Sequence, residues 1–207
     1  MSATASSTGL PHDAEARLHA AFWRAVAAQG WHGLTMRRLA AESGLPLADL
    51  RAALPTPLHA LRLHLRLTDR EVLRGTLAGQ GGSARDRLFD VLMRRFDALQ
   101  PHRPGVLRLL HDLGRDPLLA LALAPGLVVS MAWMLEAAEI GAAGAAGLVR
   151  AQGLAGLWLA ALRAWERDPS EDLGRTMAAL DRLLDRAEWL ARRLDLGAEG
   201  PEEAGAG

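Results

Sequence analysis

Apolar residues recur at helical spacing along most of the chain. Between His12 and Gln29 the apolar positions stand three or four residues apart, the period of a helix that buries one face: Leu18, Ala21, Phe22, Ala25 and Val26. The same criterion predicts further helices over residues 36–43, 46–53, 57–77, 84–99, 106–113, 117–140, 148–167 and 170–194. The sequence therefore predicts an all-α protein of about nine helices.

Several residues mark where these helices begin and end. Thr35 and Ser83 stand where a hydroxyl can cap the first turn, and Gly44 stands where a left-handed residue ends a helix. Ser170, followed by two acidic residues, is predicted to cap the last helix. Pro125, followed by a glycine, is predicted to break the seventh helix into two.

Four segments follow from these elements. We predict a disordered leader at 1–11, a three-helix unit of the helix-turn-helix kind at 12–60, a larger helical domain at 61–195 and a disordered tail at 196–207. Residues 117–135 carry no charge and are long enough to span a bilayer, but Pro125 would break such a span at its middle. We therefore expect a buried core helix and no stable membrane insertion. The leader lacks a secretory signal, so a cytoplasmic protein is expected.

Composition narrows the function classes. The 24 basic residues are all Arg, balanced by 24 acidic residues, so a DNA-binding role has to rest on local features. Cysteine is absent, which excludes disulfides and thiol chemistry. The seven His show no metal-ligand spacing, and no catalytic motif is present. We expect neither an enzyme nor a metal or other cofactor.

The three-helix unit carries the most specific pattern in the chain. Glycines, a threonine and a proline follow one another at set intervals, in Ala20-Ala21-Phe22, Gly30-Trp31, Thr35-Met36-Arg37, Leu39-Ala40, Gly44-Leu45, Leu50 and Leu54-Pro55. Over this first third the sequence resembles the tetracycline-repressor (TetR) family of transcriptional regulators. The resemblance implies a DNA operator as partner and an all-helical second domain that binds a ligand and forms a homodimer.

The resemblance places a DNA-contacting surface on the second and third helices, at Thr35, Arg37, Arg38, Pro46, Leu47, Asp49 and Arg51. This chain departs from the family pattern there, because Asp49 would face phosphates with the wrong charge and Leu47 would stand exposed. Residues 1–68 hold seven Arg against four acidic residues, a net charge of three. We expect DNA binding that is weak or depends on the dimer.

The second domain offers two further sets of candidate residues. A small hydrophobic ligand would be bound by tryptophan and methionine side chains with a few polar partners, at Arg108, His111, Met131, Trp133, Met134 and Trp158. Each of these Trp and Met side chains could equally belong to the core. Small and apolar residues of the last two helices are candidates for the dimer interface: Gly153, Gly156, Trp165, Leu180, Leu184 and Ala187.

An alternative function fits the departures in the third helix. Residues 86–110, with their Arg-rich helix and the Pro-His-Arg-Pro that follows, and the tryptophan-containing helix before Asp168 resemble the TetR-like lipid-binding proteins of ubiquinone biosynthesis. That resemblance implies a lipid or isoprenoid ligand and a third helix that no longer reads DNA. The sequence leaves a ligand-controlled transcriptional regulator as the first interpretation and this lipid-binding accessory protein as the second.

Overall fold

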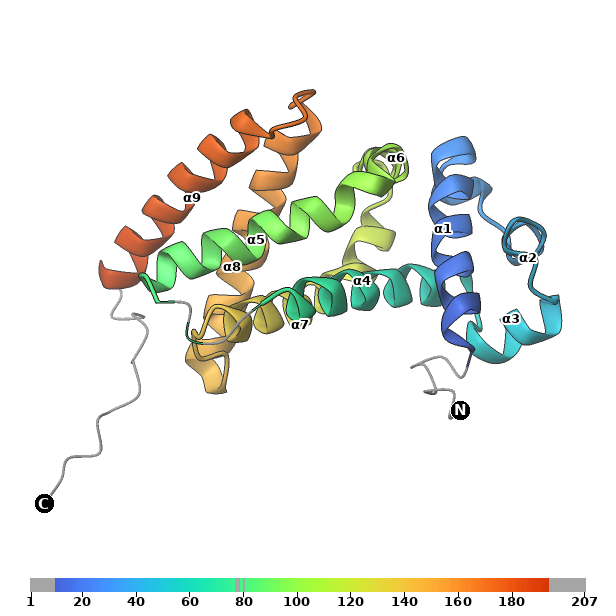
Figure 1. Cartoon of the computed structure of the whole chain (residues 1–207), viewed down its shortest axis with the longest axis horizontal. Helices are drawn as coiled ribbons and strands as arrows, with labels where there is room; N and C mark the ends of the chain where they lie inside the picture. Colours follow the sequence, from blue (N-terminus) through green and yellow to red (C-terminus); the bar gives the residue numbers. More distant parts are fainter. Residues whose placement is uncertain (1–9, 77–78, 80, 194–207) are drawn as a thin grey trace, which may run out of the picture. The chain divides into compact units, whose positions relative to one another are not determined.

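The computed structural model describes residues 10–76, 79 and 81–193. Within these residues the chain forms helices and no strands (Figure 1): α1 (His12–Gln29), α2 (Met36–Ser43), α3 (Leu47–Ala53), α4 (Pro57–Arg74), α5 (Ala84–Leu99), α6 (Arg103–Leu113), α7 (Pro117–Ala137), α8 (Gly144–Glu166) and α9 (Gly174–Arg193), with short 3-10 helices η1 (Trp31–Gly33) and η2 (Gln100–His102). The all-α prediction is confirmed. Residues 1–9 of the predicted leader and the predicted tail lie outside the described residues.

The chain folds as two compact units. The N-terminal unit comprises the residues up to Thr68 together with Leu99–Ala124, and the C-terminal unit comprises Asp69–Ala98 and the residues from Pro125 onward. The N-terminal unit thus contains α6 and the start of α7 as well as the predicted helix-turn-helix segment. The functional boundary near residue 60 stays a prediction.

Local residue chemistry sets the turns of the N-terminal unit. Gly30 ends α1 at φ 74° and ψ 177°, a conformation that essentially only glycine adopts. The Thr35 hydroxyl accepts a hydrogen bond from the Arg38 N–H (3.2 Å) and caps α2, and Gly44 ends α2 in the left-handed region at φ 70°. Both predicted helix signals are therefore confirmed.

The core of the N-terminal unit lies around α1, which packs against both α2 and α6. All five apolar residues of the predicted stripe are buried. Asp112 of α6 accepts a hydrogen bond from the backbone N–H of Trp31 (2.7 Å) and pairs with Arg108 (3.3 Å). A buried carboxylate thus fixes the turn that follows α1 to α6.

The core of the C-terminal unit contains aromatic and sulfur-containing side chains from three helices. Phe96 of α5 packs against Trp158 of α8 with the two rings tilted (4.6 Å between ring centroids), and Met131 and Met134 of α7 are completely buried. Helices α8 and α9 lie side by side (Figure 1). On the surface, Arg85 of α5 pairs with Asp181 and Asp185 of α9 at 2.6 and 2.7 Å.

Helix α7 is continuous, so the predicted break at Pro125 is wrong. The helix runs from Pro117 to Ala137 with Pro125 inside it. Pro125 has no N–H to donate to the carbonyl of Leu121. Leu121 is 70% exposed and Pro125 is also exposed, so water can satisfy that carbonyl and the helix tolerates the proline.

The start of α9 is also different from the prediction. Ser170 does not cap it, because its N–H (3.2 Å) and hydroxyl both donate to Asp168. The other carboxylate oxygen of Asp168 accepts from the N–H and hydroxyl of Thr176, at 2.8 and 2.9 Å. The buried Asp168 thus organises the loop, and α9 begins four residues after Ser170, at Gly174.

Two of the described helices, α7 and α8, are long and apolar enough to cross a membrane by length and composition. The core helices of soluble proteins satisfy the same criterion, so this finding is weak evidence for a membrane span.

Candidate functional sites

Helix α3 is held so that its outer face meets solvent. Leu50 is completely buried and anchors the helix in the N-terminal unit, and Pro46 occupies the N-cap position. Leu47, 48% exposed, and the exposed Asp49 and Arg51 lie on the outer face. The predicted exposure of Leu47 is therefore confirmed.

Helix α2 adds further candidate DNA contacts beside α3. Thr35 and Arg37 are exposed, and Arg38 forms an ion pair with Glu42 (3.0 Å) one turn later in the same helix. Among the described residues, Arg37 and Arg51 form no ion pair. They are therefore the cations of this surface that remain available to a partner. Their contacts with DNA stay a prediction.

The electrostatics of α3 are mixed. Asp49 lies in the first turn, where a carboxylate stabilises the positive end of the helix dipole. The same negative charge opposes a DNA phosphate, and Leu47 can contact a thymine methyl group but cannot hydrogen-bond a base edge. The outer face of α3 thus presents one cation, one anion and apolar groups.

The six residues predicted to bind a ligand fall into two groups. Arg108 and His111 lie on α6 in the N-terminal unit, where Arg108 pairs with Asp112 and His111 contacts Arg115. Met131, Met134 and Trp158 are buried in the C-terminal unit, and Trp133 of α7 is 55% exposed. Of the six, Met134 and Trp158 contact the same buried side chain.

That side chain is Arg95, which is not among the residues predicted from the sequence. Arg95 is 2% exposed, forms an ion pair with Asp69 of α4, lies 5.2 Å from the ring centre of Trp158 and contacts the sulfur of Met134 at 3.7 Å. The Ser130 hydroxyl donates to Asp69 (2.6 Å), and the buried Nε of Arg95 makes no hydrogen bond among the described residues. A buried guanidinium with a donor to spare can bind an acceptor oxygen of a ligand.

A signal for Arg95 was present in the sequence. It lies in helical register with Leu88, Val91, Leu92 and Leu99, the apolar stripe of α5. An arginine at such a position must be buried with a partner or must extend to solvent. The partner, Asp69, is 26 residues away on another helix, and no local pattern connects the two residues.

The residues predicted for the dimer interface fall into a buried group and an exposed group. Trp165, Leu180 and Leu184 are buried within the chain, in the packing of α8 against α9. Gly153, Gly156 and Ala187 are exposed, on the outer sides of these two helices. The exposed small residues are available to a second copy, and their role in a dimer stays a prediction.

Comparison with solved structures identifies the fold. A TetR transcriptional regulator from Nitrosomonas europaea is 18% identical, with a TM-score of 0.67 over 84% of this chain and 98% of that chain. A TetR regulator from Rhodococcus sp. RHA1 is 16% identical, with a TM-score of 0.58 over 84% and 94% of the two chains. The chain has the TetR fold. At this identity the likeness concerns the fold, and it confirms at that level the resemblance read from the sequence.

A third solved structure agrees. A TetR-family regulator from Streptomyces coelicolor is 15% identical, with a TM-score of 0.52 over 92% of both chains. No known family's sequence profile and no curated protein sequence matches the chain. The TetR fold therefore rests on the course of the backbone, and the function has to be argued from the residues of this chain.

Proposed function

We propose that the protein is a cytoplasmic, homodimeric TetR-type transcriptional regulator that binds a DNA operator and is controlled by a small hydrophobic ligand. The observation that carries this proposal is α3, which the buried Leu50 anchors while Leu47, Asp49 and Arg51 face solvent. A helix presented in this way, next to the exposed Arg37 of α2, is what insertion into a major groove requires.

The cluster around Arg95 supports control by a ligand. Asp69 already balances the charge of Arg95, so a carboxylate ligand would leave a net negative charge buried in the C-terminal unit. An uncharged apolar molecule with a carbonyl or hydroxyl oxygen suits the remaining Nε donor and the faces of Trp158 and Met134. Methionine side chains such as Met131 and Met134 are flexible enough to make room for it.

A second candidate function is favoured by the composition of α3. Asp49 and Leu47 lie where a groove-reading helix needs cations and hydrogen-bonding side chains. These residues fit a TetR-fold accessory protein of ubiquinone biosynthesis that binds a lipid or isoprenoid and has lost the ability to read DNA. The Arg95 cluster serves either function, so α3 is the element that separates the two candidates.

The test is DNA binding by the purified protein. We expect fluorescence anisotropy with the DNA upstream of its own gene to show saturable binding. For each tenfold rise in salt concentration, the logarithm of the association constant should fall by about 0.9 per phosphate contact. Arg51→Ala, on the outer face of α3, should weaken this binding, whereas Arg163→Ala, exposed on α8, should not. Indifference to DNA, together with a quinone or isoprenoid extracted from the purified protein, would instead establish the lipid-binding function.

A further inference from the structure

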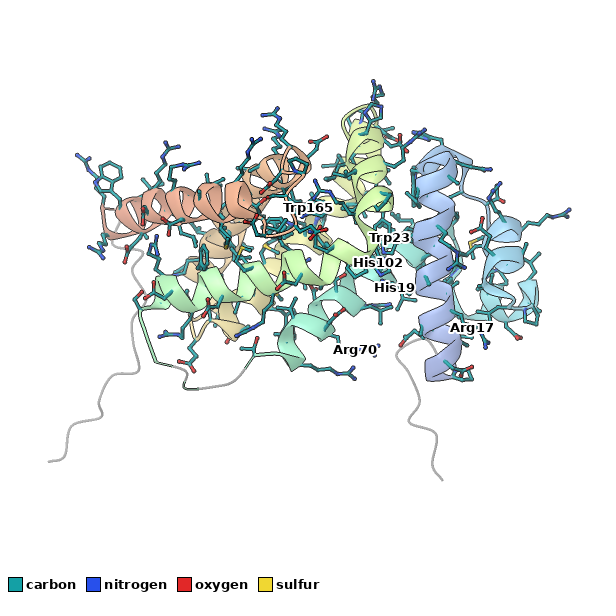
Figure 2. The ribbon with its side chains drawn as sticks, turned by 45° about the horizontal axis from the view of Figure 1, so that its top comes forward. Arg17, His19, Trp23, Arg70, His102 and Trp165 are labelled. Carbon is teal, nitrogen blue, oxygen red and sulfur yellow. The ribbon has the colours of Figure 1, made fainter. Side chains whose placement is uncertain are left out.

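The N-terminal unit contains a cluster of three histidines that neither proposed function uses. His19 of α1, His64 of α4 and His102 of η2 come from three separate elements, and their rings lie 4.4 Å (His19 to His64), 4.6 Å (His19 to His102) and 6.1 Å (His64 to His102) apart. Trp23 of α1 lies edge-on to His64 at 4.1 Å. Figure 2 shows His19, Trp23 and His102 next to one another beside α1.

Hydrogen bonds fix the protonation of the central imidazole. Trp23 Nε1–H can only donate, and it donates to His64 Nδ1 (2.9 Å). His64 Nδ1 is therefore an acceptor without a proton, and the proton of the neutral ring is on Nε2, which lies 3.3 Å from the Thr68 hydroxyl. His19 Nε2 also lies against His64 Nδ1.

A second proton on His64 would disrupt this arrangement. It would bind at Nδ1, where the Trp23 N–H already points and where His19 Nε2 leaves no room for another partner. His64 is 2% exposed, so water cannot compensate for the lost acceptor. The hydrogen bonds between α1 and α4 therefore require a neutral His64.

The other two histidines also resist protonation. Burial and the neighbouring His102 lower the pKa of His19 to about 4, against a smaller opposing effect of Glu15 on the same helix. Burial lowers the pKa of His102 as well. The groups that face His19 are thus Glu15 from α1, His64 from α4 and His102 from η2, and of these Glu15 favours a charged imidazole.

We propose that the cluster of His19, His64 and His102 is an acid-sensitive latch, which fastens α1 to α4 and η2 while its rings are neutral and releases α1 when they are protonated. Helix α2 packs directly on α1. Acid release of α1 would therefore loosen the support of α2 and α3, so that mild acidification regulates the DNA-binding-type segment itself, without any ligand.

The size of the effect follows from linkage between proton binding and opening. An opened α1 exposes a His19 with the ordinary pKa of 6.5, whereas the closed state binds the proton only near pH 4. Lowering the pH from 7.5 to 5.5 should therefore raise the opening equilibrium of α1 about tenfold through His19 alone. His102, whose pKa burial also lowers, adds to this response in the same direction.

Hydrogen exchange on the full-length protein tests the proposal. After correction for intrinsic exchange rates, amides of α1 should lose about tenfold in protection between pH 7.5 and 5.5, while amides of α8 keep theirs. In the double variant His19→Gln/His102→Gln, in which the side-chain amide that replaces the His19 ring can still donate to His64, the loss should fall below about threefold. His111→Gln, at an exposed position of α6 outside the cluster, is the matched control and should respond like the wild type.

Two outcomes would overturn the latch: protection of α1 that does not change with pH, or a double variant that responds like the wild type. His102→Gln alone, which leaves the contacts of Trp23 and His19 with His64 Nδ1 in place, serves if the double variant does not fold, and its response should lie below that of the wild type. An equal response of this single variant and the wild type would count against the cluster. DNA is not part of the experiment, so its result is independent of the proposed function.

Discussion

At the scale of single residues, Gly30 and Gly44 show how one residue type serves two purposes. Both glycines have positive φ, 74° and 70°. A Cβ at Gly30 would lie 2.5 Å from the Asp112 carboxylate and 2.8 Å from the Arg108 guanidinium, whereas a Cβ at Gly44 would meet nothing within 4 Å. Gly44 is thus needed only for its backbone conformation, and Gly30 for its conformation and for space.

The two glycines form a matched pair of substitutions. We expect Gly44→Ala to lower the free energy of unfolding by about 1 kcal/mol, the cost of a left-handed alanine. Gly30→Ala should lower it by roughly 3 kcal/mol, because the backbone conformation of Gly30 (φ 74°, ψ 177°) is costlier for alanine than the left-handed region and because the contact with Asp112 must also open. Urea denaturation followed by circular dichroism measures both, and equal losses would contradict the added cost of the backbone conformation of Gly30 and of its closeness to Asp112.

The buried pair of Asp69 and Arg95 predicts strong coupling between two residues. Arg95→Met should cost about 3 to 5 kcal/mol of stability, because Asp69 remains buried without its cation. Adding Asp69→Asn, whose amide oxygen still accepts from Ser130, should recover at least about 2 kcal/mol of that loss. The exposed pair of Glu188 and Arg192 is the control, and Glu188→Gln should change stability by less than about 0.5 kcal/mol. Additive losses in the double variant would contradict the coupling.

At the scale of elements, local patterns predicted more than long-range contacts did. The stripe of α1 and the capping of α2 were predicted correctly, because burial period and capping depend on residues a few positions apart. Trp23 and His64 are 41 positions apart, and Asp69 and Arg95 are 26 positions apart. A single sequence carries no signal that pairs such distant residues. The start of α9 was wrong because Ser170 is used by Asp168.

Pro125 offers a test of how a helix tolerates an interior proline. Pro125→Ala restores an N–H that can donate to the carbonyl of Leu121, so we expect stability to rise by about 1 to 3 kcal/mol. Pro104, in the first turn of α6, replaces an N–H that has no partner in the helix, and Pro104→Ala should change stability by less than about 0.5 kcal/mol. A destabilised Pro125→Ala protein would mean that the proline provides contacts or rigidity worth more than the hydrogen bond.

At the scale of the whole molecule, the TetR fold and the function are separate conclusions. The fold follows from the course of the helices in both units and from the likeness to solved TetR regulators. The proposed regulator requires in addition that α3 reads DNA and that the Arg95 cluster senses a ligand. If both hold, ligand and DNA must weaken each other's binding by the same factor, because coupling between two binding sites is reciprocal.

Selection from sheared genomic DNA of the source organism tests the regulator most directly. The purified protein is incubated with the fragments at physiological salt, and the retained DNA is sequenced. We expect that a few fragments sharing one short symmetric sequence are strongly enriched, and that Arg51→Ala abolishes the enrichment. Uniform retention or none, by a protein whose helical content and stability are intact, would contradict it.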